Sequence, residues 1–89
     1  MKYHITPKQA KEVTEEHFYS MFNEIVKRED WYKYHHKKMD IGKMIDWLDG
    51  VHITKGSAGI WYVQSYNIEY NAIELVDALW EAVKDNLIY

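Results

Sequence analysis

The sequence predicts a small α+β domain in which two or three helices pack against a small antiparallel sheet. Apolar residues recur at helical spacing in three separate segments, about 7–28, 41–49 and 71–87. The segment 51–66 instead alternates apolar and polar residues around a glycine-containing turn, which is typical of a β-hairpin. With 89 residues the chain has room for a single domain, residues 1–89, built on one core.

The first helix is expected over residues 7–28. Thr6 and Gln9 have the spacing of a capping box, and Pro7 between them suits the first helical position. Apolar or ambivalent residues then recur with helical period at Ala10, Val13, Thr14, His17, Phe18, Met21, Phe22, Ile25 and Val26. Most of the intervening positions are charged, so we expect them to face solvent.

The second helix is expected over residues 41–49. Four apolar residues follow the i, i+3, i+4, i+7 pattern: Ile41, Met44, Ile45 and Leu48. Asp40 is placed to cap this helix and Gly50 to end it. The pattern of the preceding segment, 31–38, allows either a helical turn capped by Asp30 or a loop that docks by its aromatic side chains.

A hairpin is expected to pair residues 51–54 with residues 60–66 through the five-residue turn 55–59. Pairing Thr54 with Ile60 places four apolar side chains on one face: Val51, Ile53, Trp61 and Val63. The other face then carries His52, Tyr62, Gln64 and Tyr66, and no helix is left to cover it. Residues 2–5 are a candidate third strand beside the hairpin.

The last helix is expected to begin at Asn71, which can cap it, with Glu74 three residues on. Its apolar face is wide, which indicates burial against more than one element. Its polar face carries an acidic stripe of Glu74, Asp77, Glu81 and Asp85. Residues 51–89 hold only two lysines against five acidic residues, so a basic protein surface suits this part of the chain.

Composition argues against catalysis and against cofactors. The chain has no cysteine, which excludes disulfides, thiolate zinc sites and a thiol nucleophile. Its adjacent histidines, His35 and His36, diverge on a helix, and we interpret them as part of a polar surface tract rather than as metal ligands. No serine has the surroundings of a catalytic triad. We therefore expect neither an enzyme nor a metal or other cofactor.

Localisation is expected to be cytoplasmic. Residues 1–7 lack the apolar core of a signal peptide. No segment approaches the roughly 18 apolar residues that a membrane span needs.

Two groups of residues are candidate binding surfaces. The first interleaves aromatic and cationic side chains: Trp31, Tyr32, Lys33, Tyr34, Lys37 and Lys38. Such a group suits a protein partner, and also stacks on bases and holds phosphates. The alternative is that Trp31 and Tyr34 fill the core while the lysines stay solvated.

The second candidate surface is the polar face of the hairpin, with His52, Tyr62 and Tyr66. Tyrosines supply a large contact area at low cost in side-chain entropy. The alternatives are an ordinary amphipathic sheet, or a face that the 31–38 segment covers.

The predicted function is that of a small non-catalytic module that binds a host or partner protein sterically, with self-association into a homo-oligomer also open. Nucleic acid is a secondary candidate partner, through 31–38. The alternative function is an oligomeric protein that sequesters a nucleotide or another anion, with Lys37, Lys38 and His35/His36 converging on it. In size and composition alone, the chain resembles small accessory proteins of phages and other mobile elements. This resemblance implies an inhibitor of a host protein and carries no site residue with it.

Overall fold

The computed structural model describes residues 1–22 and 31–87, and it confirms the α+β class. The helical elements are α1 (Pro7–Ala10), α2 (Glu15–Ser20), α3 (Trp31–His35), the 3-10 turn η1 (His36–Lys38), α4 (Ile41–Leu48) and α5 (Leu75–Leu87). The strands are β1 (His52–Lys55), β2 (Trp61–Ser65) and β3 (Ile68–Ala72).

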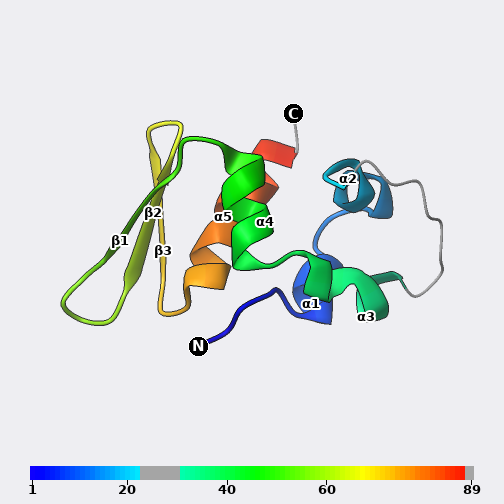
Figure 1. The fold of residues 1–89 in the computed structure, drawn as a ribbon, viewed down its shortest axis with the longest axis horizontal. Coiled ribbons are helices and arrows are strands. Elements are labelled where there is room, and N and C mark those ends of the chain that lie inside the picture. Colours follow the sequence, from blue (N-terminus) through cyan, green and yellow to red (C-terminus); the bar gives the residue numbers. More distant parts are fainter. Residues whose placement is uncertain (23–30, 88–89) are drawn as a thin grey trace.

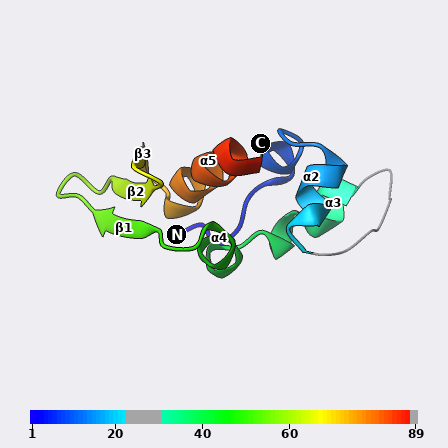
Figure 2. The same cartoon turned by 90° about the horizontal axis from the view of Figure 1, so that it is seen from above.

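The molecule is elongated, with principal extents of 42 × 25 × 18 Å. Its sheet lies at one end, α4 and α5 form the middle, and α1, α2 and α3 form the other end (Figure 1). The view from above shows the same order along the long axis (Figure 2). Segments at the two ends are therefore far apart.

The sheet is antiparallel with strand order β1-β2-β3. In β1 and β2, Ile53 pairs with Val63 and Thr54 with Tyr62, so the predicted pairing of Thr54 with Ile60 is wrong by two residues. The turn has the predicted length of five residues but spans 56–60, and the Gly56 N–H donates to the Ile60 carbonyl at 2.8 Å. A shift of two residues keeps every side chain on its face, so the predicted division into two faces still holds for the paired residues.

The third strand of the sheet is β3, and the prediction of a strand over residues 2–5 is wrong. Residues 2–5 instead run beside α4, where the Ile41 N–H donates to the Tyr3 carbonyl at 3.0 Å. A single bridge, between His4 and Asp40, replaces a ladder there. Because β3 includes residues 71 and 72, α5 begins at Leu75 rather than at Asn71.

The predicted helix over 7–28 is wrong in its first part, because α1 and α2 are two short helices with a break between them. Thr14 lies at the break in an extended conformation, and its hydroxyl accepts the His17 N–H at 3.1 Å. This cap starts α2 in a new direction, which a continuous helix does not allow. Residues 23–28 of the predicted helix and the predicted cap Asp30 lie outside the described residues.

The core is organised around α5, which packs against α4, β2 and β3. Eight of its residues are buried: Leu75, Val76, Ala78, Leu79, Trp80, Ala82, Val83 and Leu87. At the far end of the molecule an aromatic cluster continues the core, with the rings of Phe18 and Trp31 centred 4.8 Å apart.

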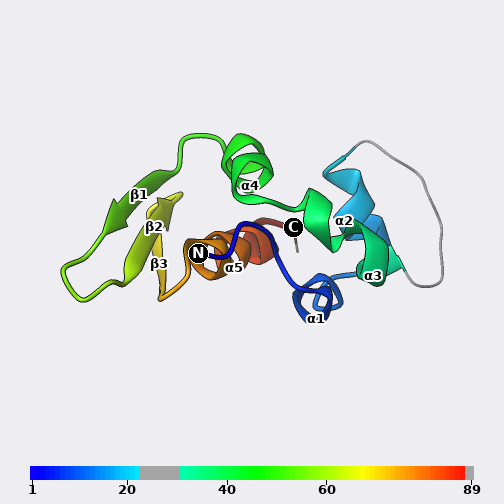
Figure 3. The ribbon, with the colours of Figure 1, turned by 60° about the horizontal axis from the view of Figure 1, so that its bottom comes forward.

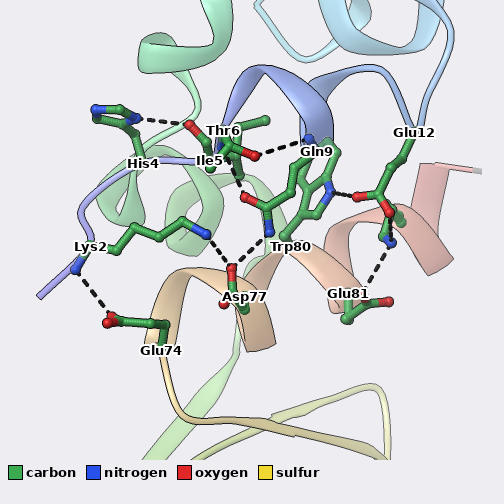
Figure 4. Close-up of polar contacts among 11 residues, drawn as sticks. Lys2, His4, Ile5, Thr6, Gln9, Glu12, Glu74, Asp77, Trp80 and Glu81 are labelled. Atoms are coloured by element: carbon green, nitrogen blue, oxygen red, sulfur yellow. Dashed lines mark hydrogen bonds and ion pairs between the residues drawn. The ribbon is translucent and has the colours of Figure 1, made fainter.

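Polar contacts tie the first twelve residues to α5 (Figure 4). Asp77 accepts from the Lys2 ammonium at 2.6 Å and from the Gln9 side-chain amide at 2.7 Å. The Trp80 indole N–H donates to Glu12 at 2.9 Å. These contacts fix the N-terminal segment across a helix that lies about 70 residues further along the chain.

The ion pair between Lys84 and Glu12 makes the stability of the protein depend on pH. Burial of the Lys84 ammonium acts to lower the pKa, but the hydrogen bonds and charges of Glu81 and Glu12 outweigh burial and raise the pKa above the ordinary 10.5. The stabilisation is therefore complete below pH 10.5 and is lost as the pH rises through the raised value. We expect the difference in unfolding free energy between the wild type and Lys84→Met to shrink above pH 10.5 in urea titrations. A constant difference would contradict this assignment.

Candidate functional site

The two candidate surfaces lie at opposite ends of the molecule. The hairpin forms the sheet end, and α3 with η1 forms part of the other end (Figure 1). The alternative in which the 31–38 segment covers the hairpin face is therefore wrong.

The outer face of the sheet is open. Five of its side chains are exposed: His52, Thr54, Gln64, Glu69 and Asn71. The opposite face carries Val63, which is fully buried, and it packs towards α5. Tyr62 is the half-buried member of the outer face.

Tyr62 is held against the turn that follows β1. A Cβ atom built on Gly56 would lie 2.7 Å from Cε2 of Tyr62, which is closer than van der Waals contact permits. Glycine at position 56 therefore lets the tyrosine ring pack closely against the backbone of the turn. This contact buries part of the ring and fixes the position of the rest.

Tyr66 lies in the turn between β2 and β3, not at the end of a strand as predicted. Tyr66 and Asn67 have φ values of 50° and 66°, the signs that a tight two-residue hairpin turn requires. The Tyr66 side chain is 67% exposed, and its hydroxyl donates to the Leu48 carbonyl at 3.4 Å. Ile68, 51% exposed, follows the turn and was not predicted as a surface residue. Its signal in the sequence was the alternating run from Ile68 to Ala72 after a two-residue turn.

The other candidate surface is divided between core and solvent. Trp31 is only 8% exposed and packs on Phe18. It therefore belongs to the core, which was the alternative to a place on the binding surface. Tyr32 is half-buried, with the Lys11 ammonium 4.6 Å above the centre of its ring. Lys33, Lys37 and Lys38 are exposed. The side chain of Tyr34 lies outside the described part of the structure.

The interpretation of His36 as a surface residue is wrong. Its ring is 7% exposed, Nδ1 lies 3.0 Å from the Tyr32 carbonyl oxygen, and the His4 ring meets it edge-on at 5.5 Å. Among residues 1–22 and 31–87, no three His, Cys, Asp or Glu side chains are grouped so that they could hold a metal ion. No helix in these ranges has both the length and the apolar character that crossing a membrane requires.

Comparison with protein-family models, with curated proteins and with solved structures finds no match for this chain.

Proposed function

We propose that this protein is a small non-catalytic module that binds a partner protein through the sheet surface, defined as His52, Tyr62 and Tyr66. The observation that carries the proposal is the exposed ring of Tyr66 at a backbone position with φ of 50°. Such a position favours glycine or asparagine, and another residue costs about 1–2 kcal/mol there. A strained residue with an exposed aromatic side chain is better explained by a contact with another molecule than by the stability of the chain.

The shape of the sheet surface supports a steric mechanism of binding. Tyr62 lies within β2 and Tyr66 in the turn that follows this strand, so the two tyrosines are separated by the last part of β2. His52, opposite Gln64, lies between them on the exposed face. Tyrosine side chains are typical anchors of protein interfaces.

Small size and tyrosine-rich composition support an accessory protein of a phage or mobile element that acts in the cytoplasm and inhibits a host protein by covering its surface. The alternative, sequestration of a nucleotide or other anion, needs Lys37, Lys38 and His35/His36 to converge on the ligand. Burial of the His36 ring gives this alternative less support.

Replacing Tyr66 with asparagine separates binding from stability. Asparagine tolerates the positive φ, so we expect the free energy of unfolding to stay constant or to rise by up to about 1 kcal/mol. Loss of an anchoring ring should weaken partner binding by about tenfold or more. The partner is first captured with the wild-type protein, and calorimetric titrations then compare its affinity for the two forms.

Tyr3→Asn is the matched control, because Tyr3 is also 67% exposed but lies outside the sheet. This variant should bind the captured partner as the wild type does. Equal affinity of the wild type and Tyr66→Asn for the partner would contradict the proposed sheet surface.

A further inference from the structure

Two segments that are distant in the sequence form a basic end of the molecule. Helix α1 packs against α3 and η1 at the end opposite the sheet, and α1 lies beside α3 in two views (Figures 1 and 3). Residues 7–11 and 31–38 contain five of the eleven Lys and Arg of the chain and none of its fourteen Asp and Glu. We call their lysines the lysine end: Lys8, Lys11, Lys33, Lys37 and Lys38.

Tyr32 lies between lysines of the two segments. The Lys11 ammonium lies over its ring, and Lys33 is the next residue in α3. Lys33 lies in α3, and Lys37 and Lys38 lie in η1, which follows α3 directly. All five lysines have exposed side chains.

The carboxylates that follow each of the two segments are held by other groups. Glu12, directly after Lys11, accepts from the Trp80 indole at 2.9 Å and from Lys84 at 3.3 Å. Asp40, two residues after Lys38, caps α4 by accepting the Lys43 N–H at 2.8 Å. Their charges are thus directed towards α5 and α4 rather than towards the lysine end.

We propose that the lysine end binds an acidic segment of a protein partner, as an interaction surface separate from the sheet surface. Five of the eleven Lys and Arg belong to these two segments, at one end of a molecule 42 Å long, and none of the fourteen acidic residues does. A short acidic segment stays on the lysine end, whereas a long polyanion continues onto the acid-rich remainder. A nucleic-acid base is further disfavoured because the Tyr32 ring is half-buried and has Lys11 over one face.

Fluorescence anisotropy with a labelled decaglutamate peptide tests this proposal. We expect binding at low ionic strength that weakens towards physiological salt, because exposed charges are screened there. Lys33→Glu in α3 and Lys8→Glu in α1 should each weaken binding about fivefold. Lys55→Glu is the matched control: it makes the same change in net charge at an exposed position of the sheet end. It should change the affinity less than about twofold.

Four results would overturn the proposal. The first is no binding of decaglutamate at low salt. The second is equal weakening by Lys33→Glu and Lys55→Glu, which would reflect net charge only. The third is an unchanged affinity in Lys8→Glu, which would separate α1 from the surface. The fourth is tighter binding of single-stranded decathymidylate than of decaglutamate, which would indicate a nucleic-acid surface.

The two proposals fail independently. Tyr66→Asn should bind decaglutamate as the wild type does, and Lys33→Glu should keep its affinity for a partner that the sheet surface binds.

Discussion

Replacing Trp80 with alanine is expected to lower the free energy of unfolding by about 3–5 kcal/mol. Trp80 is fully buried at the centre of α5, the helix that contacts both the sheet and α4. Its removal leaves a cavity in the core, because the surrounding side chains relax only in part. In a domain of this size, each kcal/mol corresponds to a shift of about 4–8 °C in Tm. Thermal unfolding followed by circular dichroism measures the effect.

Trp80→Phe separates packing from the hydrogen bond to Glu12. Phenylalanine keeps most of the buried ring and loses the indole donor. Glu12 is exposed and retains Lys84 as a partner, so its carboxylate is not left buried and unpaired. We expect a loss of about 1–2 kcal/mol in this variant. Losses of equal size in both variants would show that the hydrogen bond, and not packing, dominates at this position.

Replacing Ile5 with alanine is expected to cost about 2–5 kcal/mol. Ile5 is fully buried although it lies near the start of the chain, and its N–H donates to the Met39 carbonyl at 3.2 Å. The side chain therefore anchors the N-terminal segment in the core. Chemical denaturation measures the loss of stability, and hydrogen exchange at the Ile41 amide, which donates to the Tyr3 carbonyl, reports release of the segment.

Tyr3→Ala is the control for this segment. Tyr3 is exposed and its contribution to the structure is a backbone carbonyl, so its replacement should change stability by no more than about 0.5 kcal/mol. A large loss in Tyr3→Ala, or a small one in Ile5→Ala, would contradict this account of the anchor.

The sequence predicted the parts of the fold that depend on residues close together along the chain. The capping box of Thr6 and Gln9 is present, and Asp40 caps α4. The sheet faces were predicted correctly although the register was not, because an even shift preserves alternation. The break at Thr14 escaped prediction because apolar spacing continues across it and both short helices keep an apolar side.

The candidate surfaces were harder to predict than the helices and strands, because they depend on tertiary structure. Tyr66 was predicted as a surface residue, but its place in a tight turn required recognising β3 as a strand. The lysine end could not be found from residues 31–38 alone. It requires Lys8 and Lys11, which reach this surface only because α1 packs on α3. Trp31 looked like a surface anchor because a pattern of alternating aromatic and cationic residues does not show which ring faces the core.

The central place of α5 has a consequence for synthesis of the protein on the ribosome. The sheet, α4 and the N-terminal segment all bury their apolar sides against a helix that is translated after them. A nascent chain that lacks α5 has no completed core. Chaperones and proteases can then reach Ile5 and the inner face of the sheet, which α5 covers in the folded protein. Folding of this chain is therefore expected to be completed only once the last helix has left the exit tunnel.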